Sequence, residues 1–159
     1  MTQKSLYSNK KERKRRKMEM IELGWHIIAE LNGVDPRILD DEKYLVETLK
    51  NAAERADLTI LSVKTHKFNP QGVSVVVVVA ESHIFIHTWP EHRYAALDIF
   101  TCKSEESTWK AYKEILKKLK PGNTQVIMLK RGIVTHSNAM NLTVNAEGTT
   151  VAKGEVIVE

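Results

Sequence analysis

Apolar and polar residues alternate along several stretches of the chain, and a period of two predicts β-strands. Such stretches run from Leu23 to Leu31 and from Thr59 to Lys67. A run of β-branched residues from Val73 to Ala80 predicts a strand that is central in its sheet or buried on both faces. The turn sequences Asn32-Gly33 and Asn69-Pro70-Gln71-Gly72 follow the first two strands.

The alternation resumes after a short break at Glu81-Ser82-His83. The period of two places Phe85 and His87 on one face of the next strand and Ile84 and Ile86 on the other. The histidine thus shares a face with a phenylalanine, away from the more plainly apolar pair. Two further strands are predicted at residues 94–101, after a break at Trp89-Pro90-Glu91, and at residues 125–129.

Two stretches show the spacing of three and four residues that is typical of an amphipathic helix. The first begins after Asp40 or Asp41, either of which can cap it, and the second spans residues 104–120 with Ser107 as its cap. The apolar stripe is Leu45, Leu49, Ala52, Ala53 and Ala56 in the first helix and Trp109, Tyr112, Ile115, Leu116 and Leu119 in the second.

The order strand, helix, strands, helix, strand predicts an α+β fold. We expect a two-layer sandwich in which two helices cover one face of a mainly antiparallel sheet, within a single domain at residues 20–131. The other face of the sheet needs a cover, and a second copy of the chain is the simplest one. The tail at residues 132–159 is a possible hairpin.

Charge is concentrated at one end of the chain. The formal net charge is +4, and the basic residues of segment 10–17 account for more than that excess. Residues 1–19 are therefore expected to form a disordered basic arm, and nucleic-acid binding is not favoured because charge alone gives only non-specific attraction. A single cysteine excludes an internal disulfide, and the lack of a long apolar run excludes a membrane span or signal peptide. These features predict a cytoplasmic protein.

Residues 80–102 gather several reactive side chains. Ser82 stands between an acid and a histidine, and the only cysteine, Cys102, closes the stretch. A serine hydrolase would need a Gly-x-Ser-x-Gly elbow, which is missing here. A zinc site from His83, His87 and Cys102 lacks the usual ligand spacing, whereas a Cys102 nucleophile paired with His87 is chemically possible. On the residues alone these alternatives stay open, beside ordinary half-buried side chains.

The sequence of this stretch resembles the prokaryotic S-adenosylmethionine decarboxylase proenzyme family. The likeness covers about residues 21–130 and excludes the arm and the tail. The segments that carry it are Gly24-Trp25-His26, Asp35-Pro36-Arg37-Ile38-Leu39-Asp40, His66-Lys67-Phe68, Gln71-Gly72-Val73-Ser74, Glu81-Ser82-His83-Ile84, His87-Thr88-Trp89-Pro90-Glu91, Tyr94-Ala95-Ala96 and Phe100-Thr101-Cys102.

The resemblance implies that the hydroxyl of Ser82 attacks the carbonyl of Glu81 and converts this peptide bond to an ester. β-Elimination then cuts the chain between Glu81 and Ser82 and leaves a covalent pyruvoyl group derived from Ser82. This cofactor forms a Schiff base with S-adenosylmethionine and acts as an electron sink for decarboxylation. The product is the aminopropyl donor for spermidine biosynthesis. Such family members are homodimers of cleaved protomers with their sites at the interface.

The resemblance also assigns roles by position in the motif. It implies that Ser82 is the pyruvoyl precursor, His87 the processing base and Ser74 the processing hydroxyl. Cys102 would be the proton donor in decarboxylation, Glu91 the ribose-binding carboxylate and Phe68 the adenine-stacking ring. Histidine suits the base because its pKa lies near neutrality, and a readily ionised thiol suits the acid. No metal is implied.

Three positions depart from the family pattern, since Val75, Arg93 and Lys103 stand where glycine is usual. Arg93 matters most because it adds a long cation close to Glu91 and could reach the substrate pocket. An arginine decarboxylase of the same family is therefore an alternative, although Glu91 and Phe68 favour the adenosyl substrate. A second alternative is an inactive paralogue that acts as a binding or regulatory subunit, which self-cleavage would rule out.

Overall fold

The computed structural model describes residues 22–132 and the backbone of residues 156–158. The predicted arm at residues 1–19 and most of the predicted tail lie outside the described residues. Within the described residues, no helix is both long enough and apolar enough to cross a membrane.

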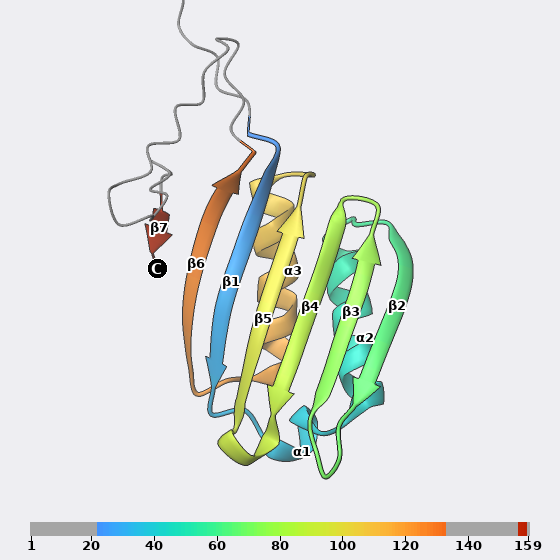
Figure 1. Cartoon of the computed structure of the whole chain (residues 1–159). Helices are drawn as coiled ribbons and strands as arrows, with labels where there is room; N and C mark the ends of the chain where they lie inside the picture. Colours follow the sequence, from blue (N-terminus) through green and yellow to red (C-terminus); the bar gives the residue numbers. More distant parts are fainter. Residues whose placement is uncertain (1–21, 133–155, 159) are drawn as a thin grey trace, which may run out of the picture.

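A single antiparallel sheet forms one layer of the molecule (Figure 1). Its described strands follow the order β2-β3-β4-β5-β1-β6-β7, and each strand pairs antiparallel with its neighbours. The strands are β1 (Gly24–Asn32), β2 (Ile60–Lys67), β3 (Val73–Val79), β4 (Ser82–Trp89), β5 (Tyr94–Thr101), β6 (Asn123–Arg131) and β7 (Val156–Val158). The strands predicted up to residue 131 are confirmed, although β4 begins two residues earlier than expected.

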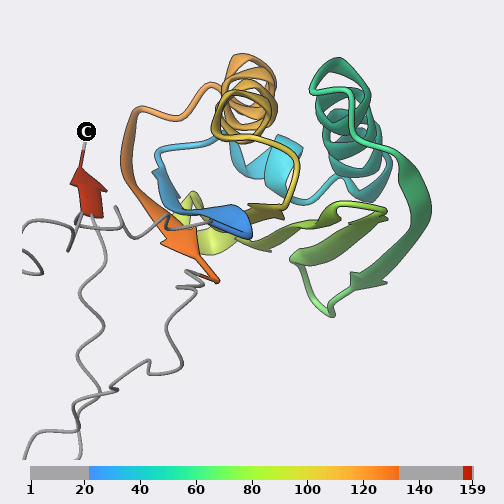
Figure 2. The same cartoon turned by 90° about the horizontal axis from the view of Figure 1, so that it is seen from above.

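Two long helices form the second layer, on one face of the sheet (Figure 2). They are α2 (Glu42–Arg55) and α3 (Glu105–Leu119), so the predicted two-layer α+β sandwich is confirmed. The short helix α1 (Pro36–Leu39) and the 3-10 helix η1 (Pro90–His92) were not predicted. Asp35 caps α1 by accepting a hydrogen bond from the amide of Arg37 at 2.9 Å.

The helix caps follow the local hydrogen bonds. Asp41 caps α2, because its carboxylate accepts from the amide of Tyr44 at 2.9 Å. The prediction of Ser107 as the cap of α3 is wrong, since Ser104 accepts from the amide of Ser107 at 3.0 Å. Ser107 is instead buried in the first turn, where its hydroxyl donates to the carbonyl of Ala56.

The core lies between the helices and one face of the sheet. Its sheet side includes Ile27, Leu31, Val75, Val77, Ile84, Ile86, Leu97 and Ile99, and its helix side includes Leu45, Leu49, Ala52, Ala111, Ile115 and Leu119. Each fully buried leucine or isoleucine contributes on the order of 2 kcal/mol. Both predicted stripes face the sheet, although Trp109 and Leu116 are only partly buried.

The opposite sheet face, which we call the open face, is not covered by α2 or α3 (Figure 2). As predicted, Ile84 and Ile86 are buried under the helices, whereas Phe85 and His87 are half-buried on the open face. Strand β3 lies inside the sheet, which is one of the two possibilities that its sequence predicted. Its residues Ser74, Val76 and Val78 are only half-buried on the open face, so the strand is not fully buried on both sides.

Candidate active site

Ser82 is the first residue of β4 and follows a tight turn. The strands β3 and β4 are joined by Ala80-Glu81 alone, because Val79 pairs with Ser82. The φ angle of Ser82 is 141°, a backbone conformation that residues with a side chain rarely adopt. Such strain costs on the order of 1–3 kcal/mol and persists only where the surroundings enforce it. The backbone of Ser82, directly after the Glu81–Ser82 peptide bond, is therefore held in an unfavourable conformation.

The carbonyl of Glu81 accepts a hydrogen bond from the backbone amide of Cys102 at 2.9 Å. Cys102 follows β5 directly, and Ser82 pairs with Thr101, so the register of β4 and β5 creates this contact. A fixed N–H donor polarises a carbonyl and stabilises the negative charge that develops on its oxygen during nucleophilic attack. The thiol of Cys102 is exposed at the same end of the sheet.

The side chain of Glu81 anchors the turn to Thr59. One carboxylate oxygen accepts from the Thr59 amide at 3.0 Å, and the other accepts from the Thr59 hydroxyl at 3.3 Å. The amide of Ala80 in turn donates to the Thr59 carbonyl at 2.8 Å. Partial burial works to raise the pKa of Glu81, but the hydrogen bonds from Thr59 and the charge of Lys103 outweigh it, so the pKa lies below its ordinary value. The carboxylate therefore holds the turn in its charged form.

Ser74 and His87 form a second serine–histidine pair, on neighbouring strands. They are direct partners in the β3–β4 ladder, and the Ser74 hydroxyl lies 2.5 Å from Nδ1 of His87. The imidazole also contacts the rings of Phe68 and Trp89, with centroid distances of 5.1 and 4.1 Å. Burial lowers the pKa of His87 below its ordinary value. The imidazole is therefore mainly neutral near pH 7 and able to accept a proton.

The two serine–histidine regions stand at opposite ends of β4, which runs along the full length of the sheet (Figure 1). His87 is five positions after Ser82, so the two residues are roughly 16 Å apart along the strand. The structure thus brings Ser82 to Cys102 and Ser74 to His87, but it does not join these two pairs within one chain. Cys102 is accordingly not paired with His87 in the same chain.

The structure does not place the three proposed zinc ligands of this chain close enough to bind one ion. His83 and His87 are four residues apart on β4, a separation of roughly 13 Å that no single ion can bridge. Among residues 22–132, no group of three or more histidine, cysteine, aspartate or glutamate side chains could hold a metal ion.

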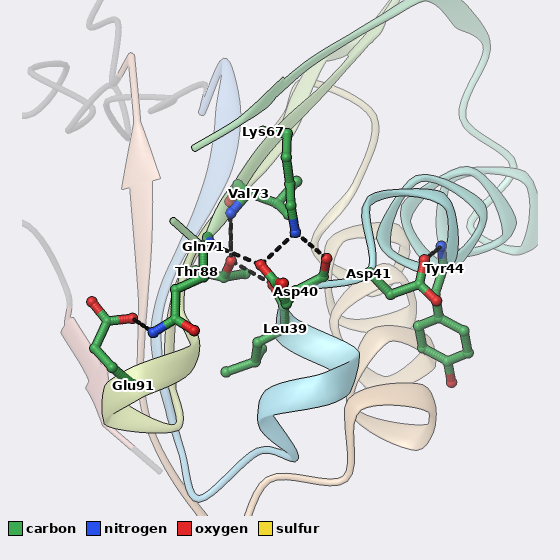
Figure 3. A network of polar contacts seen from close by, with 10 residues as sticks. Leu39, Asp40, Asp41, Tyr44, Lys67, Gln71, Val73, Thr88 and Glu91 are labelled. Atoms are coloured by element: carbon green, nitrogen blue, oxygen red, sulfur yellow. Dashed lines mark hydrogen bonds and ion pairs between the residues drawn. The ribbon is translucent and has the colours of Figure 1, made fainter. Parts of the chain in front are cut away.

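The predicted substrate-binding residues lie at the His87 end. Phe68 precedes the turn into β3, and 38% of its surface is exposed. Its ring is 4.5 Å from that of His66 and 5.1 Å from that of His87. Glu91 lies in η1, and its Oε2 accepts a hydrogen bond from the Gln71 side-chain amide at 3.1 Å (Figure 3). An exposed ring and an oriented carboxylate therefore flank this end of β4.

A polar network between α1 and β3 fixes the turn that carries Phe68 (Figure 3). The carboxylate of Asp40 accepts from the amide of Gly72 at 2.9 Å and forms an ion pair with Lys67. The buried hydroxyl of Thr88 donates to the carbonyl of Leu39 at 2.7 Å. Gly72 is required here, because its φ is 101° and a Cβ atom would lie 2.9 Å from the Thr88 carbonyl oxygen. The sequence patterns gave no sign of this network.

Of the three residues expected to depart from the family pattern, Arg93 and Val75 are directed away from the reactive side chains, whereas the charge of Lys103 acts on the carboxylate of Glu81. Arg93 adopts a φ of 53°, and its guanidinium donates to the carbonyls of Gly33 and Val34 at 3.4 Å. Its side chain is therefore directed at the loop after β1. Lys103 donates to the carbonyl of Asp57, and Val75 is fully buried on the helix-covered face of β3.

Comparison with known proteins identifies close relatives. Residues 25–132 match the family described as S-adenosylmethionine decarboxylase. The S-adenosylmethionine decarboxylase proenzyme of Methanococcus maripaludis is 50% identical over 115 residues, which cover 72% of this chain and 94% of that protein. The proenzyme of the same name from a Sulfurihydrogenibium species is 43% identical over 131 residues, with coverage of 82% and 92%. The crystal structure of the adenosylmethionine decarboxylase from Aquifex aeolicus VF5 superimposes with a TM-score of 0.70 at 38% identity, covering 74% of this chain and 98% of that one.

Proposed function

Because the chain belongs to the S-adenosylmethionine decarboxylase family, we propose that it is a self-cleaving, pyruvoyl-dependent enzyme that decarboxylates S-adenosylmethionine to the aminopropyl donor for spermidine synthesis. The proposed cleavage lies between Glu81 and Ser82. The observation that carries this proposal is the environment of that bond, where a strained Ser82 follows a carbonyl that the Cys102 amide polarises. These residues fit the formation of a pyruvoyl group, which would supply an electron sink for the carbon that loses carbon dioxide.

The separation of the two ends of β4 supports a site shared between two protomers. A two-fold axis that lies between two stacked sheets, parallel to their planes and perpendicular to the strands, would bring two open faces together and exchange their ends. The Ser74–His87 pair of one protomer would then meet Ser82 and Cys102 of the other. Exposed apolar side chains on the open face, such as Ile28 and Ile127 at 37% and 40% exposure, would be covered by this contact. We therefore propose a homodimer of cleaved protomers.

Each side chain then has a task that its setting supports. The neutral imidazole of His87, oriented by Ser74, removes the Cα proton of residue 82 in the elimination step. The exposed thiol of Cys102 returns a proton to the substrate carbon after decarboxylation. The exposed ring of Phe68 stacks on adenine, and the Glu91 carboxylate accepts hydrogen bonds from the ribose hydroxyls.

Arginine as the substrate receives no support from the side chain that suggested it. The guanidinium of Arg93 donates to backbone carbonyls of the loop after β1, whereas Glu91 accepts from Gln71. The acidic and aromatic groups at the His87 end suit a ribose and an adenine. We therefore propose S-adenosylmethionine as the substrate.

The mass of the purified full-length chain tests the enzyme class. We expect two polypeptides divided between Glu81 and Ser82, the second of them blocked at its N-terminus by a pyruvoyl group. Borohydride reduction in the presence of S-adenosylmethionine should link the decarboxylated product covalently to the second polypeptide through the reduced Schiff base, with loss of the carbonyl oxygen as water, and arginine should form no adduct. A single uncut chain that traps neither compound would refute the proposed function, and an arginine adduct would reassign the substrate.

Mixed variants test whether the site is shared. Ser82→Ala and His87→Ala chains, carrying different affinity tags, are each expected to stay uncut when expressed alone. When they are co-expressed, the mixed dimer contains one site with both Ser82 and His87, so the His87→Ala chain should be cut. Co-expression of two differently tagged His87→Ala chains is the control. If the mixed sample also stays uncut, His87 does not act across a dimer interface.

A further inference from the structure

Ser82 has a histidine beside it that the roles above leave unused. Nδ1 of His83 lies 3.2 Å from the hydroxyl oxygen of Ser82. A neutral imidazole with Nδ1 unprotonated accepts the hydroxyl proton at this distance. His87, by contrast, lies roughly 16 Å further along the strand, and its Nδ1 is already in contact with Ser74. Within its own chain, the histidine in contact with the Ser82 hydroxyl is therefore His83.

Neighbouring strands hold the His83 ring on the open face. The ring of Phe100 on β5 and the ring of His26 on β1 both meet it edge to face, with centroid distances of 6.1 and 6.4 Å. The guanidinium of Arg131 stacks over Phe100 at 4.6 Å. These contacts come from three strands, and they restrict the ring to the side of β4 on which it reaches Ser82.

His26 is mainly neutral near pH 7, so it adds no positive charge beside His83. Burial, followed by the charge of Arg131, lowers the pKa of His26, and the charge of Asp98 only partly opposes this. Nη1 of Arg131 lies 3.3 Å from Nδ1 of His26, which fixes the ring proton on Nε2. That nitrogen lies 3.3 Å from Oδ1 of Asp98. Neutral His26 thus lies between the positive charge of Arg131 and the negative charge of Asp98, next to His83.

We propose that His83 is the base of the first step of self-cleavage, a step distinct from the one that uses His87; this assignment rests on the proposed function. The Ser82 hydroxyl gives its proton to Nδ1 of His83, and its oxygen bonds to the carbonyl carbon of Glu81. The Cys102 amide stabilises the resulting oxyanion. The bond between that carbon and the nitrogen of Ser82 then breaks, and His83 returns the proton to this nitrogen. The amide has become an ester and a free amine, with no atoms gained or lost and no oxidant required.

The two histidine variants should stop at different stages. Hydroxylamine under mild, neutral conditions separates these stages because it cleaves esters but leaves amides, including Asn32-Gly33, intact. The His87→Ala chain should accumulate the ester, so hydroxylamine should split it after Glu81. The His83→Ala chain should remain an amide that resists hydroxylamine, with self-cleavage slowed by roughly 10²- to 10⁴-fold. Added imidazole should partly restore cleavage in His83→Ala, which a purely structural role would not allow.

Two further variants keep the outcome interpretable. His83→Gln retains a polar side chain of similar size that is not a base, and it should behave like His83→Ala. His92→Ala removes an exposed histidine of η1 and should cleave like the wild type. The assignment is overturned if either His83 variant cleaves at the wild-type rate or accumulates a hydroxylamine-sensitive ester. Failure of the wild-type chain to cleave would instead refute the proposed function itself.

Discussion

At each end of β4, Nδ1 of a histidine contacts a serine hydroxyl, yet the backbone around the two serines differs. Ser74 and His87 are cross-strand partners in a regular ladder, with a contact of 2.5 Å. Ser82 and His83 are sequence neighbours, with a contact of 3.2 Å, and Ser82 alone of the two serines has a positive φ. The proposed cleavage before Ser82 alone therefore requires more than a serine–histidine contact.

The carbonyls that precede the two serines differ as well. The carbonyl of Glu81, before Ser82, accepts a hydrogen bond from the Cys102 amide at 2.9 Å. The carbonyl of Val73, before Ser74, stands at the end of the regular β3–β4 ladder and accepts from the Thr88 hydroxyl at 3.2 Å, and Ser74 has no positive φ. Strain and polarisation coincide only at the first of these bonds. This difference explains why the chain would cut itself before Ser82 and leave Ser74 intact.

The largest expected effect comes from exchanging the serines for alanine one at a time. Ser82→Ala should abolish self-cleavage, because no hydroxyl remains to attack the Glu81 carbonyl. Ser74→Ala removes only a hydrogen bond to His87, worth about 1–1.5 kcal/mol, so cleavage should slow by roughly 5- to 10-fold. Denaturing electrophoresis over time measures both rates. Equal loss of cleavage in the two variants would erase the distinction between the two ends.

Cys102→Ala should separate cleavage from decarboxylation. The backbone amide that supports the Glu81 carbonyl remains in this variant, so the chain should still be cut. Decarboxylation should lose its proton donor, and kcat should fall by roughly 10²- to 10⁴-fold. Intact mass reports the cleavage, and release of labelled carbon dioxide reports kcat. A Cys102→Ala variant that decarboxylates at the wild-type rate would remove the thiol from the reaction.

Phe68→Ala should weaken substrate binding without affecting the Ser82 end. A base stacked on an aromatic ring contributes about 1–3 kcal/mol, so KM should rise by roughly 5- to 150-fold while self-cleavage is retained. The matched control is Leu61→Ala. Leu61 is an apolar residue of the edge strand β2, which precedes Phe68, and its side chain is 63% exposed. Steady-state kinetics on the cleaved enzymes measures both; an unchanged KM for Phe68→Ala would place adenine elsewhere.

Asp40→Ala and Asp41→Ala form a closely matched pair. Each removes a carboxylate that accepts a backbone amide at 2.9 Å, so each should lower the free energy of unfolding by about 1 kcal/mol in urea titrations. Only Asp40 holds the turn that carries Phe68, so KM should rise for Asp40→Ala and stay constant for Asp41→Ala. Parallel changes in KM would show that the turn does not depend on Asp40.

The smallest effect concerns pH. Because burial holds the pKa of His87 below 6.5 in the folded state, the unfolded chain takes up a proton first as the pH falls. The contribution of His87 to stability is therefore present above pH 6.5 and is lost as the pH falls from there through the folded pKa. Urea midpoints at about pH 7.5 and about pH 5.5 should differ less for His87→Gln than for the wild type. The pKa of His26 is also lowered, so the stability of His87→Gln should still depend on pH to a smaller extent. If the difference between the two urea midpoints is the same in His87→Gln and in the wild type, burial does not lower the pKa of His87.

The pattern of the sequence predicts the layers of this fold well, because a period of two or of three and four residues reports directly which side chains face the core. It cannot decide between Ser104 and Ser107 as a cap, since either hydroxyl suits the task and only the path of the chain after β5 selects one. The motif predicts Ser82 and His87 as site residues. That they lie at opposite ends of β4, and that Ser82 is strained, depends on strand length and register, which no local pattern specifies.

The strand order has one more consequence for a chain cut after Glu81. Strands β1, β2 and β3 would belong to the first polypeptide, and β4, β5 and β6 to the second. In the sheet β1 lies between β5 and β6, while β3 lies beside β4, so the two polypeptides would be interleaved along three ladders. Cutting the backbone would thus release neither piece. It would turn a one-chain folding problem into an association, and thermal unfolding of the mature protein would become dependent on its concentration.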